Sequence, residues 1–426
     1  MTTRREFIRN AAVAAGGAAL FGPDGLSLGR SDGPSAVRSA VAPAGASAGS
    51  RVVSVAASDM LADAKYNPPA VGRAFEAGMR ELTGEKTAAS AWASLVTPDD
   101  VVGIKINCLG APKISSSVES INAVIAGLKS AGVKENNIIV WDRLDREFQR
   151  TGLTINKGTA GVRVQGTSTQ GESILPWVEG YDREVYLSSD AGTLKKFREL
   201  CQSGYFTGAS YREIFNSVTW LWMLSRLGDE RAKAFEPELR RLYSAYDDRD
   251  GIKKIADQVI DKFDGVTIPD EEKSCFSAIV TKDITKLVNI AVLKHNEDSG
   301  VTWATKNIAL GVTTNKVRFH IDYCAKAIPD ILSMPCLKNK MILHIGEAAK
   351  ISTVSVGGTH MAFDNRIFFS RDPVAMDRIG LDILEEKRRA QGLESIRPIA
   401  GHVASCARKG LGTDDFARID WRKIEV

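Results

Sequence analysis

The amino-acid sequence predicts an α/β fold, in which a mostly parallel open sheet carries helices on both faces and is interrupted by a helical insertion. Short apolar runs, typical of strands buried on both faces, recur along the chain and end in polar side chains. A segment with marked helix ends separates the first two runs, and a long stretch in the middle has helical apolar spacing. The apolar runs cover residues 101–106, 137–141, 287–293, 341–343 and 367–369.

The first βαβ unit is the most clearly marked of these elements. Residues 101–106 form its first predicted strand, and residues 137–141 form its second. Between them, Ser116 with Glu119 predicts a capping box at the start of a helix, and Gly132 stands where that helix should end. A helix between two buried strands predicts that the strands lie parallel in one sheet.

The polar residues after the apolar runs predict the position of a ligand site. In an open parallel sheet the carboxyl ends of the strands share one edge, and ligands bind in the crevice beyond that edge. We therefore expect a pocket where these runs end. The residues that follow the runs are Asn107 and Cys108, Asp142 and Arg143, Lys294 to Asn296, His344 and Glu347, and Arg371 and Asp372.

The central stretch differs from its flanks. Residues 168–273 are predicted to form a helical insertion or cap, because their apolar residues have helical spacing punctuated by glycines. Its aromatic side chains are expected to pack as a small core, and a lid over the sheet edge is the alternative. The predicted divisions are therefore residues 1–48, an α/β domain at 49–167 and 274–426, and the insertion.

The N-terminal segment is predicted to be an export signal followed by a linker. Arg4 and Arg5 precede an uncharged run at 11–21, which is too short to cross a bilayer as a helix. The pattern resembles a twin-arginine signal, so we expect the twin-arginine export machinery as a partner. The mature protein is then periplasmic or otherwise extracytoplasmic, without a stable membrane span.

Composition excludes several classes of protein. Hydrophobic residues make up 44% of the chain and charged residues 25%, as in an average globular protein, so disorder throughout is excluded. The formal net charge is only +4, so nucleic acid is not expected as a partner. The six cysteines include no C-x-x-C pair, so no iron–sulfur cluster is expected.

Lys105 is the first candidate ligand-binding residue. It lies inside an apolar strand, where an ammonium group without a partner carries a large desolvation cost. Two interpretations remain open together: Lys105 binds an anionic group of a ligand, or it pairs with Asp142 on the neighbouring strand. Asn107, which follows the same strand, is expected to contribute an amide to the site.

A second group of donors surrounds the end of the run at 287–293. Lys294, Asn296, Lys306 and Asn307 concentrate ammonium and amide groups around one strand-to-helix turn, which suits an anion. Ordinary solvent-facing polarity is the alternative for Lys306 and Asn307. His295 alone is more often structural, but its neighbours make it the strongest candidate for acid–base catalysis.

Two aspartates complete the predicted site. Asp372 precedes Pro373, which predicts a helix N-cap, and it is also a candidate ligand contact. Asp377 and Asp142 join His295 as candidate catalytic groups. The sequence contains no nucleophile elbow, P-loop or G-x-G-x-x-G motif. The cofactor is therefore unknown, with a divalent metal held by Asp and His side chains as a variant.

The chain resembles the domain of unknown function family 362, particularly its exported members with twin-arginine signals. The resemblance implies an α/β domain and a shared set of polar positions, but no activity. Some relatives bind iron–sulfur clusters through an added ferredoxin-like segment whose cysteine pattern this chain lacks. The matching segments are residues 100–107, 139–143, 292–296, 300–302, 306–307, 372–375 with Asp377, and 410–412.

Three functional hypotheses follow. The first is an exported enzyme that binds a small anionic substrate or cofactor at the carboxyl edge of the sheet. The second is a non-catalytic extracytoplasmic protein that binds a ligand or a redox partner. The third is a structural or interaction role for the helical insertion. An enzyme needs a titratable group aimed at the ligand in addition to converging donors, whereas a binding protein needs the donors alone.

Overall fold

The computed structural model describes residues 50–169, 177–188, 270, 272–319, 324–354 and 360–426. The predicted export signal, Cys201, His320 and most of the predicted helical insertion lie outside the described residues. The described part of the insertion contains strand β7 (Tyr181–Ser188), which pairs antiparallel with β8 (Lys273–Ser277).

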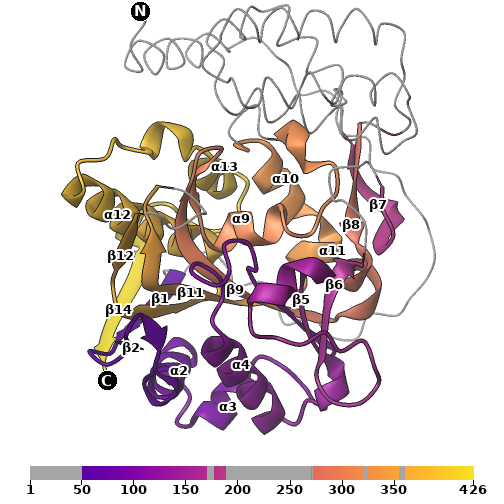
Figure 1. The fold of residues 1–426 in the computed structure, drawn as a ribbon, viewed down its shortest axis with the longest axis horizontal. Coiled ribbons are helices and arrows are strands. Elements are labelled where there is room, and N and C mark those ends of the chain that lie inside the picture. The colour runs from indigo at the N-terminus through magenta and orange to yellow at the C-terminus, as the bar shows by residue number, and fades with distance from the viewer. Residues whose placement is uncertain (1–49, 170–176, 189–269, 271, 320–323, 355–359) are drawn as a thin grey trace, which may run out of the picture.

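A mixed, mostly parallel sheet with helices on both faces forms an α/β fold, as the sequence predicts (Figure 1). Its strand order is β14-β1-β13-β11-β9-β4-β5-β6, and the five strands from β11 to β6 run parallel to one another. Two short strands, β10 and β12, pair antiparallel with β9 and β11. The bounds are β1 (Ser50–Ala56), β4 (Val102–Lys105), β5 (Ile138–Leu144), β6 (Arg163–Ser168), β9 (Lys286–Asn296), β10 (Gly300–Thr302), β11 (Met341–Ser352), β12 (Met361–Phe363), β13 (Arg366–Ser370) and β14 (Ile419–Glu425).

Two strands correct the expectation that all five apolar runs end at a common edge. Strand β11 continues to Ser352, so His344 and Glu347 lie within the strand and not after it. Strand β13 pairs antiparallel with both β1 and β11, and Ser370 at its end lies opposite His344 near the start of β11. Its carboxyl end therefore lies at the opposite edge from the ends of β4, β5 and β9. The residues after β13, including Asp372, begin at that opposite edge. An isolated apolar run carries no information about strand direction, so the sequence could not reveal this.

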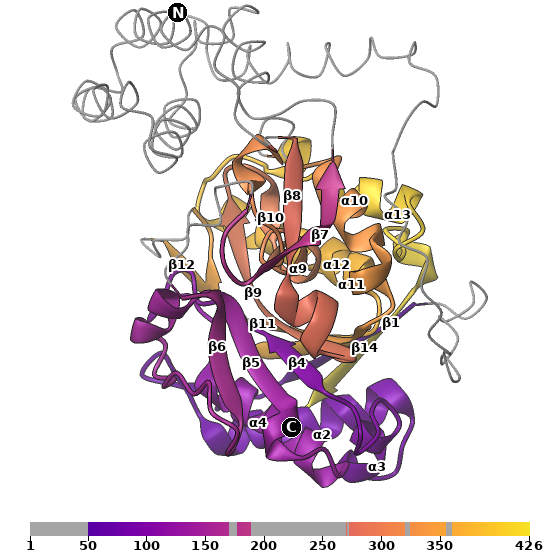
Figure 2. The same ribbon diagram turned by 90° about the vertical axis from the view of Figure 1, so that its right-hand side faces the viewer.

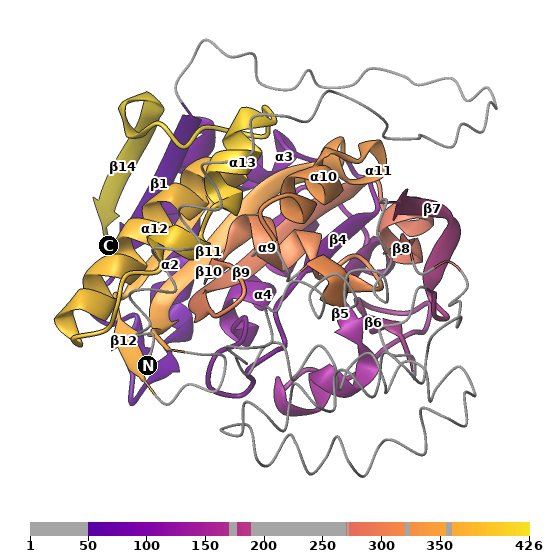
Figure 3. The same ribbon diagram turned by 90° about the horizontal axis from the view of Figure 1, so that it is seen from above.

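Two layers of helices cover the sheet (Figures 2 and 3). The α2–α4 layer and the α9–α13 layer pack on opposite faces, each over its own apolar cluster. The helices are α2 (Pro68–Thr83), α3 (Ala88–Ala93), α4 (Val118–Ser130), α9 (Ala304–Ala309), α10 (Ala327–Ser333), α11 (Pro335–Lys338), α12 (Pro373–Ala390) and α13 (His402–Arg408). Short helical turns are η1 (Glu135–Asn137), η2 (Asp145–Arg150), η4 (Ile279–Asp283), η5 (Lys316–Phe319), η6 (Arg397–Ile399) and η7 (Phe416–Arg418), and a small hairpin joins β2 (Leu61–Ala62) to β3 (Lys65–Tyr66).

Successive strand residues supply the two apolar clusters in turn. Phe368 packs in the cluster beneath α9–α13, and Phe369 packs in the cluster beneath α2–α4. Ile139 and Val140 of β5 divide in the same way. Because side chains alternate across a strand, continuous apolar runs are expected wherever both faces of a sheet are covered.

Close packing around Trp303 holds α9 and α12 against the sheet. A Cβ atom on Gly346 of β11 or on Gly380 of α12 would lie 2.3 or 2.1 Å from the Trp303 ring. The indole Nε1 donates to the Ala291 carbonyl of β9 at 3.2 Å. Because these two positions are glycines, the Trp303 ring fits between β11 and α12, immediately before α9 begins.

The start of α4 differs by one residue from the predicted capping box. Ser117, not Ser116, is the N-cap, and its hydroxyl accepts from the backbone N–H of Ser120. The Ser116 hydroxyl instead accepts from the Asn107 N–H and donates to the Ile290 carbonyl, both at 2.8 Å. Ser116 is thus drawn into a contact between the loop after β4 and strand β9. Gly132 follows the end of the helix with a φ of 89°, as expected.

Two general properties of the described residues complete the fold. None of their helices is both long enough and apolar enough to cross a membrane. None of the five described cysteines forms a disulfide.

Candidate functional site

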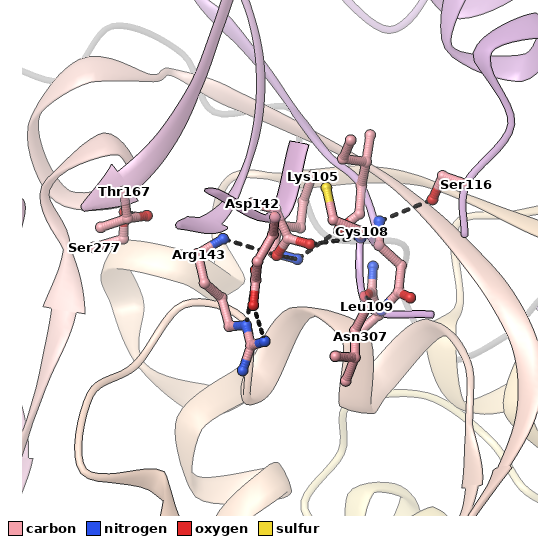
Figure 4. Close-up of polar contacts among 12 residues, drawn as sticks. Lys105, Cys108, Leu109, Ser116, Asp142, Arg143, Thr167, Ser277 and Asn307 are labelled. Carbon is pink, nitrogen blue, oxygen red and sulfur yellow. Dashed lines mark hydrogen bonds and ion pairs between the residues drawn. The ribbon is translucent and has the colours of Figure 1, made fainter. Parts of the chain in front are cut away.

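The end of strand β4 carries a buried ion pair (Figure 4). Lys105 is 1% exposed, and its Nζ lies 2.7 Å from Oδ1 of Asp142 on β5 and 2.7 Å from the Ile106 carbonyl. The other carboxylate oxygen of Asp142 accepts from the Cys108 N–H at 2.7 Å. The predicted pairing of Lys105 with Asp142 is therefore confirmed.

The electrostatics of this pair keep Asp142 ionised. Burial alone would raise its pKa, but Lys105 and then Arg143 outweigh that effect and hold the pKa below its ordinary value. Asp142 stays a prediction as a catalytic group. Its carboxylate is bound by the protein's own donors, so as a general acid it would have to break the ion pair.

Glycine at position 311 allows the backbone to cover Lys105. A Cβ atom there would lie 2.4 Å from Lys105 Cε and 2.4 Å from the Asn307 carbonyl oxygen. The turn after α9 therefore packs directly against the Lys105 side chain. The sequence did not point to Gly311, because a single glycine forms no motif.

A second ion pair lies beside the first. Arg143 follows Asp142, and its guanidinium pairs with Glu147 on η2. Burial would lower the pKa of Arg143, but Glu147 and Asp142 outweigh that effect and raise it. The two carboxylates of this region are therefore each matched by a cation.

Lys294, at the end of β9, is buried as deeply as Lys105 but contacts no carboxylate among the described residues. It is 2% exposed, and its Nζ donates to Oδ1 of Asn107 at 2.7 Å and to the Leu109 carbonyl at 2.9 Å. Burial lowers the pKa of Lys294 to about 7, against a smaller raising effect of Asp142. Lys306, Arg143 and Lys105 add smaller lowering effects, which are included in this value. The group therefore titrates near neutral pH.

A chain of amide side chains links the ends of β4 and β9 to α9. The Asn107 amide donates to Oδ1 of Asn307 at 2.9 Å, and the Asn307 amide donates to Oδ1 of Asn289 at 2.8 Å. Asn289 in turn donates to the Ala304 carbonyl at 3.1 Å. The structure thus brings the predicted residues Asn107, Asn307 and Lys294 together. Asn289 lies in the middle of an apolar run, and no spacing rule pointed to it.

Lys306 and Asn296 form the next contact along the same edge. Lys306 on α9 donates to Oδ1 of Asn296, which also accepts from the backbone N–H of Asp298 at 2.9 Å. Lys306 lowers the pKa of Lys294, which places both ammonium groups in one electrostatic environment. The predicted strand-to-helix cluster is therefore present in the structure.

His295 lies on the other side of strand β9. Neighbouring residues of a strand point to opposite faces, so Lys294 and Asn296 share a face that His295 does not. The His295 ring contacts the Val354 carbonyl through Nδ1. The structure does not bring His295 to Lys294, and its catalytic role stays a prediction.

Asp377 stabilises the start of α9. Its carboxylate accepts from the Ala304 N–H at 2.6 Å and the Thr305 N–H at 3.1 Å, and also from the Thr305 hydroxyl. Burial raises the pKa of Asp377 to about 7, although these hydrogen bonds lower it. His402 Nε2 lies 3.9 Å away. Asp377 therefore has a structural explanation, and its proposed catalytic role stays a prediction.

Asp372 stabilises the start of α12, as its N-cap pattern predicts. Its Oδ1 accepts from the N–H groups of Val374 at 2.8 Å and Ala375 at 2.9 Å. Its Oδ2 accepts from the Ser50 hydroxyl at 2.5 Å and the Thr413 N–H at 3.0 Å. Four protein donors surround this carboxylate, so its predicted ligand contact has no support in the geometry.

Sequence reasoning did not single out two buried polar groups, Lys316 and Tyr181. Lys316 opens η5 and is 9% exposed, and Tyr181 opens β7 and is 4% exposed. Neither Nζ of Lys316 nor the Tyr181 hydroxyl has a hydrogen-bond partner among the residues that the structure describes. Both lie outside the strand-end pattern, so no signal in the sequence could have found them.

The described residues do not bring three or more His, Cys, Asp or Glu side chains together as metal ligands. The side chains at the ends of β4, β5 and β9 are ammonium, guanidinium and amide groups around two carboxylates, those of Asp142 and Glu147. This set of donors suits an anion better than a cation.

Comparison with known proteins yields two partial matches. No curated protein matches the chain. A crystal structure of a protein from Thermotoga maritima matches with 10% identity and a TM-score of 0.36, covering 78% of this chain and 61% of that protein. The chain thus spans less than two thirds of that protein's length. Residues 247–382 match the family described as Domain of unknown function (DUF362), and this match supports the resemblance for its segments between Val292 and Asp377.

Proposed function

We propose that this protein binds a small anionic molecule, as a substrate or cofactor, at the carboxyl ends of β4, β5 and β9. The observation that carries the proposal is Lys294, a buried lysine whose Nζ contacts only neutral acceptors among the described residues. A buried ammonium group is costly unless an opposite charge compensates it. An anionic ligand would supply that charge.

The neighbouring charges support the same conclusion. Lys105 pairs with Asp142 and Arg143 pairs with Glu147, so neither carboxylate is left over for Lys294. Cations with unmatched charge in a low-dielectric region attract anions more strongly than exposed cations do. The amides of Asn107 and Asn307 add uncharged polar groups that could orient the ligand.

We further propose that the protein is an enzyme in which Lys294, rather than His295, transfers the proton. A catalytic acid or base works best when its pKa lies near the operating pH. The pKa of Lys294, lowered to about 7 by burial, meets this condition, and Lys294 lies among the converging donors. A non-catalytic binding protein would need the same donors but no titrating group, and it is the alternative.

Isothermal titration calorimetry with sulfate tests the binding proposal, because the charge of sulfate is constant between pH 6 and pH 9. We expect tighter binding at pH 6 than at pH 8.5, since Lys294 is protonated below its pKa of about 7 and neutral above it. Lys294→Met should weaken binding at pH 6 by about tenfold to a hundredfold, the worth of one hydrogen bond to a charged group.

Lys129→Met is the matched control. Lys129 lies on the last turn of α4 with an exposed side chain, so the variant loses the same charge away from the site. Equal weakening by the two variants, or sulfate affinity that is independent of pH, would show that binding is a general surface effect and that the proposal is wrong.

We also propose that the protein is exported by the twin-arginine pathway. The support is the sequence alone, Arg4 and Arg5 before a short uncharged run. Replacing both arginines by lysine should retain the protein in the cytoplasm of its host on cell fractionation. Unchanged export of that variant would refute the pathway.

A further inference from the structure

Two buried donors, Lys316 Nζ and the Tyr181 hydroxyl, have no hydrogen-bond partner among the described residues and lie within the electrostatic influence of the Arg143–Glu147 ion pair. Arg143 and Glu147 are among the charges that act most strongly on both Lys316 and Tyr181. Leaving a buried polar group without a hydrogen bond costs about 1–3 kcal/mol, and more if the group is charged. Such groups are rare in folded proteins and point to a missing partner.

The backbone holds these two groups on neighbouring segments. Tyr181 of β7 lies opposite Ser277 at the end of β8. Strand β8 is hydrogen-bonded to the segment that leads into η5, because the Ser277 N–H donates to the Val312 carbonyl and the Thr314 N–H donates to the Cys275 carbonyl. Lys316 follows two residues after Thr314. Both donors are therefore fixed by one continuous hydrogen-bonded unit.

Lys316 and Lys294 are influenced by the same charged side chains. Asp142, Arg143 and Lys105 act on the pKa of both lysines, and burial is the largest influence on each. The Tyr181 hydroxyl keeps its proton at neutral pH, because burial raises its pKa. Tyr181 can therefore donate a hydrogen bond, so a group that compensates both Tyr181 and Lys316 must accept hydrogen bonds.

We infer that Lys316 and Tyr181 form a second anion subsite, and that the ligand carries two oxyanion groups, one beside Lys294 and the other against Lys316 and Tyr181. The inference rests on the proposed function of the Lys294 site and extends it to a substrate class. A short dicarboxylate is the simplest molecule with this chemistry. An ordered water is the competing occupant of the second subsite.

Calorimetric titration at pH 7 with malonate, succinate and glutarate, against the monocarboxylates of equal length, tests this inference. For the best-fitting length we expect the dicarboxylate to bind at least about tenfold more tightly than the monocarboxylate, since a charge-assisted hydrogen bond is worth about 1.5–3 kcal/mol. Lys316→Met should reduce that preference to less than about threefold and leave the monocarboxylate affinity unchanged. Lys294→Met should weaken both ligands.

A second variant keeps the test decisive if Lys316→Met does not fold. Tyr181→Phe removes only the hydroxyl, and it should reduce the dicarboxylate preference by about twofold to fivefold, as expected for one neutral hydrogen bond. Equal affinities of the two ligand classes in the unmodified protein would overturn the second subsite while leaving the Lys294 site intact, as would a preference that survives both variants. Failure of every carboxylate and of sulfate to bind would overturn both proposals.

Discussion

Lys105 is the last residue of β4, and Lys294 lies near the end of the neighbouring parallel strand β9. The two lysines are buried to nearly the same extent, 1% and 2% exposed. Lys105 Nζ contacts the Asp142 carboxylate, whereas Lys294 Nζ contacts two neutral oxygens. Burial lowers the pKa of Lys294 to about 7, because the raising effect of Asp142, which Lys294 does not contact, is smaller than the effect of burial. Equal burial therefore produces a structural ion pair at one strand end and a group suited to ligand binding at the next.

The largest expected effect on stability comes from removing the Lys105–Asp142 ion pair. Asp142→Ala removes the partner of Lys105 and leaves the Cys108 N–H without its acceptor. We expect the free energy of unfolding to fall by about 3–5 kcal/mol, the usual cost of leaving one member of a buried pair uncompensated. Urea denaturation at pH 7 measures it.

Glu135→Ala is the control for that prediction, because it breaks an ion pair with Lys129 in which both side chains are about half exposed. It should cost about 1 kcal/mol or less. If Asp142→Ala costs no more than this control, the Lys105–Asp142 pair is not what holds the strand ends together.

Giving Lys294 a carboxylate partner, like that of Lys105, is expected to have a smaller effect, and on sulfate affinity instead of stability. Asn107→Asp places a carboxylate where Lys294 now contacts an amide oxygen. The pKa of Lys294 should rise, because the nearby negative charge favours the ammonium form. Sulfate affinity at pH 6 should fall by about tenfold, since the new carboxylate competes with the anion.

The pH dependence of Asn107→Asp sharpens that result. Because Lys294 should stay protonated in this variant, the sulfate affinity should no longer fall between pH 6 and pH 8.5. Asn107→Ser, which removes the amide without adding charge, is the matched control. Sulfate binding in Asn107→Asp that remains as tight and as dependent on pH as in the unmodified protein would contradict the assignment of Lys294.

The smallest effect is expected at His295, next to Lys294 in the sequence but on the opposite face of β9. His295→Ala should change sulfate affinity by less than about twofold, or about 0.4 kcal/mol. The calorimetric titration used for Lys294→Met measures it. A tenfold loss without loss of stability would restore His295 as a site residue.

Much of the architecture was predictable because local patterns encode it. The strand, helix and strand of the first βαβ unit follow from apolar runs and a glycine stop, and the N-cap at Asp372 follows from its position before Pro373. The direction of β13 was not predictable. Whether a strand pairs parallel or antiparallel depends on its neighbours in the sheet, and those neighbours lie far away in the chain.

The candidate site was predictable only in part, for the same reason. Lys105 was identified because it lies inside an apolar run. Four further residues were identified because they follow a run or lie in the turn after one: Asn107, Lys294, Lys306 and Asn307. Asn289, Lys316 and Tyr181 carry no such mark. Asn289 matters because of its hydrogen bonds to residues distant in the chain. Lys316 and Tyr181 matter because they are buried without a hydrogen-bond partner among the described residues. The sequence alone shows neither property.

The sequence by itself determined the strands and helix of the first βαβ unit, the N-cap of α12 and the position of Lys105 inside an apolar strand, because periodicity and capping act between residues close together in the chain. Only the tertiary structure decided that Lys105 would meet a carboxylate and that Lys294 would meet two neutral oxygens. The reason is physical: the pKa of a buried group depends on charges and dipoles within a few ångströms in space, and folding alone brings those together.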